Sequence, residues 1–185
     1  MTTYVLLLRG INVGGKNKVP MSELKARLED VGFSHVSTYI ASGNVIVESD
    51  KQPSVIQELV EKALINHFTL DSELIKVLVL SYEQLKAVIA NKPKGFGEQP
   101  DTFHSDAIFL MNIPTPEAMA VFKPRDGVDK IWPGDGVIYS QRLSALRTKS
   151  RLGQIVGTPA YRSMTIRNWN TTTKLLHLLE DRKSV

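Results

Sequence analysis

The apolar and polar positions of the chain repeat one rhythm in each half. In the first half, a continuous apolar run over Thr3–Leu8 predicts a buried strand. Apolar residues at helical spacing from Met21 to Val31 predict a helix that stops at Gly32. The remaining pattern predicts a helix over Ser54–Phe68 and strands over His35–Ala41, Val45–Ser49 and Leu74–Leu80. A further helix is expected to begin at Ser81, which forms a capping box with Gln84. The first six elements form a split βαβ unit, the order of a ferredoxin-like sheet.

The second half restarts this order after a break. Asn91–Asp101 is rich in proline, glycine and charge, as a linker or mobile loop is. The pattern beyond it predicts strands over Ala107–Met111, Val128–Trp132, Val137–Gln141 and Ser163–Arg167, and helices that Thr115-Pro116 caps, near Arg151–Val156 and over Thr171–Leu179. Pro133–Gly136 reads as a hairpin turn. We therefore predict an α+β protein of two lobes, each a ferredoxin-like antiparallel sheet with helices on one face. The predicted boundaries are 1–90 for the first lobe, 91–104 for the linker and 105–185 for the second lobe.

Composition narrows the class of protein. With 42% hydrophobic and 23% charged residues the chain is typical of a globular protein. No apolar run approaches the roughly 20 residues that a bilayer span needs, and Arg9 interrupts the first apolar stretch, so we expect neither a membrane partner nor a signal peptide. The chain has no cysteine, which excludes disulfides and thiolate chemistry and suits a cytoplasmic location. The 4 histidines are far apart in sequence, so no metal site or cofactor is predicted.

Charge is unevenly distributed. Residues 1–90 carry 9 Lys and Arg against 10 Asp and Glu, whereas residues 91–185 carry 14 against 9. Arg142–Lys174 contains no acidic residue and carries the cations Arg142, Arg147, Lys149, Arg151, Arg162, Arg167 and Lys174. Such a stretch is either a solvated face or a surface that attracts anions.

The segment Gly10–Lys16 fits the G-x-x-x-x-G-K pattern of a phosphate loop. The position that should supply a magnesium-binding hydroxyl is Asn17, and Pro20 delays the helix that should begin at the lysine. ATP hydrolysis is therefore not expected. Two interpretations of the loop stay open: an anion-binding backbone nest with nearby cations, or glycines that only permit a tight loop. The candidate ligand residues of this loop are Arg9, Gly10, Asn12, Gly14, Gly15 and Lys16.

Two further polar clusters are candidates. Ser42, Gly43 and Asn44 form a turn between two predicted strands. Near the C-terminus, Asn170 or Thr171 can cap the last helix, and Arg167 and Asn168 precede its N-terminus, a place that favours anions. Trp169 between them reads as an anchor in the core or between the lobes. The candidate ligand residues here are Ser42, Asn44, Arg167, Asn168, Thr171 and Lys174.

The chain resembles a known family at three places. The opening LLRGINVGGKNKVPM, the hairpin TYIASGNVI and the closing TIRNWNTTTKL are similar to an uncharacterised bacterial family that is known only as a domain of unknown function. The resemblance spans nearly the whole chain and implies an α+β fold of two lobes related to the ferredoxin-like topology. It implies no activity, substrate or catalytic residue.

Three functions remain open at this point. The leading hypothesis is the binding of a phosphorylated or otherwise anionic small molecule in a cleft between the lobes, formed by Arg9–Lys18 and Arg167–Lys174. The first alternative is a nucleic-acid-binding module that contacts phosphates through Arg142–Lys174, since the strands lack the aromatic platform of RNA-recognition modules. The second is an enzyme acting on a nucleotide-like substrate, although no catalytic constellation is legible. The sequence does not predict an oligomeric state.

Overall fold

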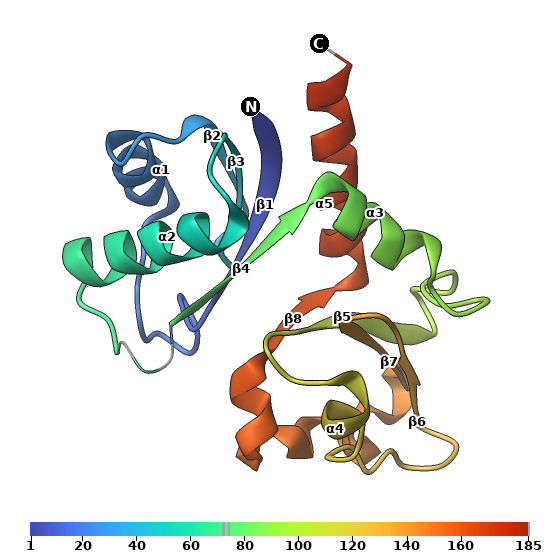
Figure 1. The fold of residues 1–185 in the computed structure, drawn as a ribbon. Coiled ribbons are helices and arrows are strands. Elements are labelled where there is room, and N and C mark those ends of the chain that lie inside the picture. The colour runs from blue at the N-terminus through green and yellow to red at the C-terminus, as the bar shows by residue number, and fades with distance from the viewer. Residues whose placement is uncertain (72, 74, 185) are drawn as a thin grey trace. The chain divides into compact units, whose positions relative to one another are not determined.

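A computed structural model describes residues 1–71, 73 and 75–184, and the chain divides into two compact units (Figure 1). The first unit contains Met1–Leu85 together with the residues from Leu175 onward, and the second contains Lys86–Lys174. The boundaries fall inside the helices α3 (Tyr82–Ala90) and α5 (Trp169–Lys183). The second unit is thus inserted into the first, and the C-terminal part of the chain belongs to the first unit rather than to a second lobe over 105–185.

The first unit has the strand order of a ferredoxin-like sheet. Its four strands are hydrogen-bonded in the order β2-β3-β1-β4, and every neighbouring pair is antiparallel. The elements are β1 (Thr2–Arg9), α1 (Met21–Asp30), β2 (Ser34–Tyr39), β3 (Asn44–Ser49), α2 (Pro53–His67) and β4 (Lys76–Ser81). This order confirms the predicted fold class. Leu74, where the sequence pattern places the start of the last strand, lies outside the described residues.

Both faces of the first sheet are buried. Because side chains alternate along a strand, Leu6 and Leu8 of β1 face the core under α1 and α2, whereas Val5 and Leu7 point to the opposite face and are equally buried. Arg182 of α5 donates a 2.6 Å hydrogen bond to the hydroxyl of Ser37 in β2. The last turns of α5 therefore pack with the first unit, in addition to the two predicted helices.

Local signals in the first unit act as predicted. Ser81 and Gln84 form the capping box at the start of α3, with the Ser81 N–H donating to the Gln84 side chain and the Gln84 N–H to the Ser81 hydroxyl. Gly43 takes a φ of 90° in the turn between β2 and β3, and a Cβ there would lie 2.9 Å from the Ile11 side chain. Only glycine fits that turn.

The second unit repeats the strand order with a different crossover. Its four strands are ordered β6-β7-β5-β8, again antiparallel, which confirms the predicted repeat of topology. Three short 3-10 helices stand where the first unit has α2. The elements are β5 (Phe103–Leu110), α4 (Thr115–Met119), β6 (Asp129–Pro133), β7 (Val137–Leu143), the 3-10 helices η2 (Ser144–Lys149), η3 (Leu152–Gly157) and η4 (Pro159–Ser163), and β8 (Met164–Asn168).

The start of the second unit departs from the sequence prediction. Phe103 and His104 belong to β5, although the polar residues before Ala107 are typical of a loop. Phe96, inside the predicted linker, is only 1% exposed, so this residue of the segment 91–102 belongs to the second unit's core. At α4, the Thr115 hydroxyl donates to the carbonyl of Gly134 and Pro114 holds the cap position. Thr115 is therefore not the helix cap.

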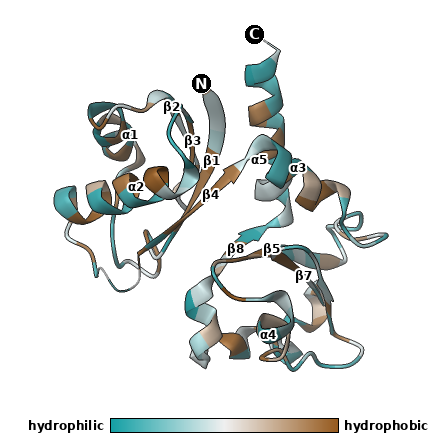
Figure 2. Ribbon diagram, viewed as in Figure 1, coloured by the Kyte–Doolittle hydropathy of each residue, from teal (hydrophilic) through white to brown (hydrophobic). Residues whose placement is uncertain are grey.

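The two faces of the second sheet have different cores. Aliphatic residues such as Ile108 and Ile138 pack with Phe122 on the face that α4 and η3 cover. The opposite face carries an aromatic cluster in which the ring of Phe96 meets the rings of Trp132, Tyr139 and Trp169 edge to face, with centroids 5.0 to 5.8 Å apart. Figure 2 shows the apolar runs of β1 and β4 in the first unit and of β5 in the second. Trp169 is thus a core residue of the second unit.

Candidate functional site

Polar side chains gather at one end of the second sheet, on the face that also carries the aliphatic core. Asp106 of β5 lies opposite Ser140 of β7 and Asn168 of β8 in the strand register, and His104 lies opposite Arg142. Cross-strand partners project on the same side of a sheet. Three strands therefore bring an imidazole, a carboxylate, a guanidinium and an amide to one surface.

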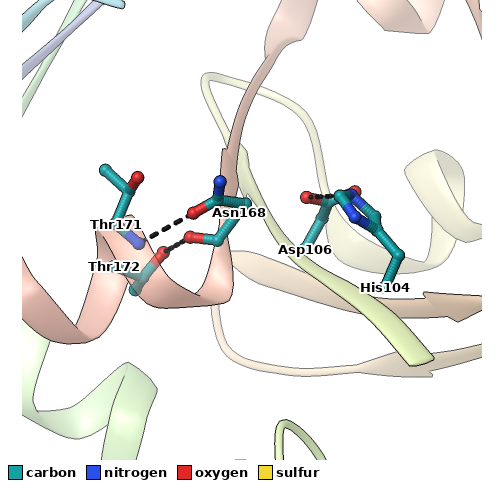
Figure 3. Close-up of polar contacts among 5 residues, drawn as sticks. All are labelled: His104, Asp106, Asn168, Thr171 and Thr172. Atoms are coloured by element: carbon teal, nitrogen blue, oxygen red, sulfur yellow. Dashed lines mark hydrogen bonds and ion pairs between the residues drawn. The ribbon is translucent and has the colours of Figure 1, made fainter. Parts of the chain in front are cut away.

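His104 and Asp106 form the closest polar pair of this surface (Figure 3). The Nε2 atom of His104 lies 3.0 and 3.1 Å from the two carboxylate oxygens of Asp106. Burial raises the pKa of the Asp106 carboxyl above its ordinary value, and the nearby charges of His104 and Arg142 offset part of that shift. Asp106 holds the imidazole in place, and a side-chain exposure of 41% leaves the His104 ring accessible to a ligand.

Each residue of this pair borders a pocket. His104 borders a pocket of about 80 Å³ that is also lined by Gly97, Pro100, Ser105, Asn168, Trp169 and Asn170. Asp106 borders a pocket of about 130 Å³ whose other polar lining residues are Ser140, Arg142 and Tyr161. The apolar lining of this second pocket includes Phe122, Leu152 and Ile155. The pair thus borders a small polar pocket through His104 and a larger amphipathic pocket through Asp106.

Asn168 connects the smaller pocket to the start of α5. Its side-chain oxygen accepts a 2.8 Å hydrogen bond from the N–H of Thr171, and its carbonyl accepts one of 3.0 Å from the Thr172 hydroxyl (Figure 3). Asn168 is therefore the cap of α5, and the prediction of Asn170 or Thr171 in that role is wrong. The positive end of a 15-residue helix adjoins the pocket that His104 borders.

The other candidates near the C-terminus lie elsewhere. Arg167 is 8% exposed, projects from the opposite face of β8 and donates from Nη1 to the carbonyl of Ile166 at 2.8 Å. Desolvation lowers the pKa of Arg167 to about 10. Thr171 is buried within the first turn of α5, and Lys174 is exposed on the helix. Of the four candidates predicted here, Asn168 borders the small pocket.

The glycine loop of the first unit is a hairpin stapled by two asparagines. Gly14 and Gly15 take φ values of 57° and 74°, which suits a tight two-residue turn between Val13 and Lys16. The Asn12 amide donates to the carbonyls of Val19 and Ala41, at 3.0 and 2.8 Å.

Asn17 forms the second staple. Its amide donates to the carbonyl of Gly10 at 2.8 Å, and its oxygen accepts from the N–H of Asp71 at 2.9 Å. The side chains of both asparagines are therefore engaged in holding this tight loop. Lys16 is exposed and Arg9 is half-buried.

The turn cluster of the first unit is also structural. Asn44 is fully buried and its amide donates to the carbonyl of Tyr39 and to the hydroxyl of Ser42, both at 3.0 Å. These two residues fasten the connection between β2 and β3. All candidates from Arg9 to Asn44 belong to the first unit, whereas Arg167–Lys174 belongs to the second.

Several residues of the pocket surface were missed by sequence reasoning. His104, Asp106, Ser140 and Tyr161 were not among the predicted ligand residues. A signal for two of them exists, because positions two apart on a strand share a face, so a strand that begins at Phe103 pairs His104 with Asp106. The polar character of both residues hid the start of that strand.

Metal and membrane sites are not found in the part of the chain that the structure describes. Among those residues, no three His, Asp or Glu side chains come close enough together to hold a metal ion. No helix within the same residues is long and apolar enough to cross a membrane.

Comparison with known proteins supports the fold and adds no activity. No curated protein matches the chain. A solved structure described as conserved bacterial protein SP0830 from Streptococcus pneumoniae is similar, with 28% identity and a TM-score of 0.77. The match covers 96% of this chain and 98% of that one. The model of the family described as "Protein of unknown function (DUF1697)" matches residues 1–139. The chain therefore belongs to the DUF1697 family of proteins of unknown function.

Proposed function

We propose that the second unit binds a small phosphorylated or otherwise anionic molecule in the pocket bordered by His104, Asn168 and Asn170. The observation that carries the proposal is that an imidazole, two side-chain amides and the start of a long helix line one pocket of about 80 Å³. These groups can all donate hydrogen bonds, and the positive end of a helix favours negative charge. A pocket of this size accepts a single phosphate or carboxylate group.

The adjoining pocket supports a ligand larger than an inorganic ion. Arg142 and Tyr161 border it together with Asp106, and apolar side chains complete its walls. A guanidinium donates hydrogen bonds to a second acceptor group of the ligand, and a carboxylate accepts a hydrogen bond from a hydroxyl or amine. The combination favours a molecule with an anionic group at one end and a mixed polar and apolar body at the other.

The proposal is tested by ligand-induced stabilisation of the full chain. Purified protein is heated with orthophosphate, sugar phosphates, nucleotides and small carboxylates, and hits are titrated by calorimetry. A ligand present at about 100 times its dissociation constant stabilises the folded state by roughly 2.7 kcal/mol. We expect the stabilisation to disappear in His104→Ala and to persist in His177→Ala, which removes an exposed histidine from the body of α5.

Three outcomes contradict the proposal, in whole or in part. Failure of every anion to stabilise the wild-type protein removes the binding function. Stabilisation that survives in both histidine variants and in Asn168→Ala places the ligand elsewhere. Loss of stabilisation only in Arg142→Ala moves the anionic group to the larger pocket. In that case the anion-binding function survives but the assignment of the small pocket fails.

The His104–Asp106 pair favours a second candidate function, an enzyme that acts on the bound anion. A carboxylate that fixes one nitrogen of an imidazole leaves the other nitrogen to accept a proton from a substrate or water. Incubation of each stabilising ligand with the protein, followed by mass spectrometry, tests this candidate. Conversion that is lost in His104→Gln supports it, and unchanged ligands exclude it.

We also propose a cytoplasmic location for the protein, with which the absence of cysteine is consistent.

A further inference from the structure

The positive charge of the protein is concentrated in the second unit. Residues 86–174 contain 13 Lys and Arg against 7 Asp and Glu, a net charge of +6, whereas the rest of the chain contains 10 against 12, a net charge of −2. Two cations of the predicted basic stretch are not on the surface: Arg167 is buried, and Arg142 is half-buried near Asp106 and Asp129. The exposed cations around the 3-10 helices are therefore the ones that a partner can reach.

The buried carboxylate of Asp129 binds the backbone at two of these exposed cations, Arg125 and Arg151. Asp129 is 6% exposed, and its Oδ2 atom accepts hydrogen bonds from the N–H groups of Arg125 and Arg151, at 2.9 and 2.8 Å. One carboxylate oxygen thus fixes the loop before β6 against the chain between η2 and η3. The arginine side chains at both anchor points are exposed.

We define the basic surface as Arg125, Arg147, Lys149, Arg151 and Arg162. The last four lie on or between the consecutive 3-10 helices η2 to η4, which follow one another in orange in Figure 1. All five side chains are exposed, and none forms an ion pair or side-chain hydrogen bond with any described residue. The exposed Asp126 is the nearest acidic residue in sequence to these cations. The surface carries uncompensated positive charge.

We propose that this basic surface binds the phosphate backbone of a nucleic acid, independently of the small-anion pocket. Neutralising phosphates with Lys and Arg releases counterions and requires no apolar contact. An acidic protein partner would need an apolar interface core, yet Val156 is the only large hydrophobic residue that is exposed among the described residues of the second unit. None of the large hydrophobic residues exposed in the described part of the chain is aromatic, so we expect base stacking to contribute little and the affinity to depend only weakly on sequence.

Fluorescence anisotropy with labelled oligonucleotides measures this binding directly. Single-stranded RNA, single-stranded DNA and a DNA duplex of random sequence are titrated with the full-length protein at several salt concentrations. Because each phosphate contact contributes about −0.7 to the slope of log K against log salt for single strands, five contacts give a slope of about −3 to −4. We expect similar affinities for different sequences of the same length.

A matched pair of variants locates the surface. Replacing Arg147, Lys149, Arg151 and Arg162 with glutamine removes four charges of the surface, and we expect affinity to fall by at least about tenfold and the slope to shrink. The control replaces four exposed lysines of the first unit, Lys25, Lys51, Lys62 and Lys76, and keeps most of the binding. Circular dichroism and tryptophan fluorescence verify that both variants are folded. His104→Ala is expected to leave nucleic-acid affinity unchanged, which separates this proposal from the small-anion pocket.

Three results overturn the proposal. A slope near zero excludes phosphate contacts, and an equal loss of affinity in both charge variants shows only a net-charge effect. Equal affinity for polyglutamate of the same length identifies a general attraction to polyanions or an acidic protein partner instead of a nucleic acid.

Discussion

The two units have the same strand order and differ in what crosses their sheets. In the first unit, α2 is a 15-residue helix that buries Ile56, Val60 and Leu64 on the sheet. In the second unit the same crossover consists of η2, η3 and η4, of which Ile155 is the one buried residue among those described. This topology therefore does not require a long amphipathic helix between the third and fourth strands, provided that other elements bury the apolar residues of the sheet.

Ala118, Phe122 and Ile155 cover the face of the second sheet that the 3-10 helices share with α4, and the segment 91–102 and the start of α5 cover the opposite face. Phe96 and Trp169 close the face opposite to the 3-10 helices with Tyr139 beneath them. The 3-10 helices bury fewer side chains than α2 does, and three of their exposed side chains, Arg147, Lys149 and Arg162, are cationic. The larger pocket is lined in part by Leu152, Ile155 and Tyr161 of these 3-10 helices, which also carry the cations Arg147, Lys149 and Arg162 of the basic surface.

The largest expected effect separates the stability of the two units. Phe96→Ala should destabilise the second unit by about 3–5 kcal/mol, and Leu64→Ala should destabilise the first by about 2–5 kcal/mol, because each deletes a buried side chain. Both tryptophans, Trp132 and Trp169, lie in the second unit, so fluorescence reports on it alone, whereas circular dichroism reports on both.

Denaturant titrations of these two variants reveal whether the units unfold separately. We expect Phe96→Ala to shift the fluorescence transition to lower denaturant and Leu64→Ala to shift mainly the circular dichroism transition. If both probes move together in both variants, the chain unfolds as one cooperative unit and the energetic contrast between the units disappears.

The next largest effect concerns the carboxylate that organises the 3-10 region. Burial raises the pKa of Asp129, but hydrogen bonds from the Ser150 hydroxyl and from two backbone N–H groups outweigh it and lower the pKa below the ordinary value of 3.8. Asp129→Ala should cost about 2 kcal/mol at neutral pH, since hydrogen bonds to charged groups contribute about 1.5–3 kcal/mol.

The sign of the pH dependence follows from the lowered pKa. The stabilisation by the Asp129 carboxylate is complete above pH 3.8 and is lost as the pH falls through the folded-state pKa. The difference in the free energy of unfolding between wild type and Asp129→Ala, measured by urea titration, should therefore be smaller at pH 3 than at pH 7. A gap of constant size would mean that the carboxylate charge does not matter.

A smaller effect tests the hairpin of the first unit. Asn12→Ala removes two hydrogen bonds donated to Val19 and Ala41 and a third accepted from the N–H of Val19, and it should destabilise the protein by about 1–2 kcal/mol. Thermal melting in the absence of ligand measures the loss, with Lys18→Ala as an exposed control from the same loop. An unchanged melting temperature would reopen the interpretation of this loop as a ligand site.

The smallest effect lies in the aromatic cluster. The Tyr139 hydroxyl donates to the carbonyl of Val88, and Tyr139→Phe should cost about 1 kcal/mol because that carbonyl loses its donor. Burial raises the pKa of Tyr139 to about 12 from 10.0, so its contribution is complete below pH 10 and is lost as the pH rises towards 12. The difference in stability between wild type and Tyr139→Phe should therefore be smaller at pH 11 than at pH 8. A difference that is undiminished at pH 11 would contradict the raised pKa of Tyr139.

The sequence by itself determined the strand order of both units, the capping box at Ser81 and the turns at Gly43 and Pro133–Gly136, because these depend on local periodicity and on backbone conformations that few residues adopt. It also located Asn168 near a helix start. Only the tertiary structure decided that His104 and Asp106 belong to a strand, since a polar strand end has no hydrophobic alternation to reveal it. The burial of Phe96 could not be predicted either, because a single aromatic residue among prolines and glycines becomes part of the core only when it packs against a sheet that is distant in sequence. Four cations of the basic surface were legible in the sequence as the stretch Arg142–Lys174. The pockets, and the addition of Arg125 to that surface, depend on contacts between segments far apart in sequence, such as Arg125 and Arg151 on Asp129, and local patterns carry no record of such contacts.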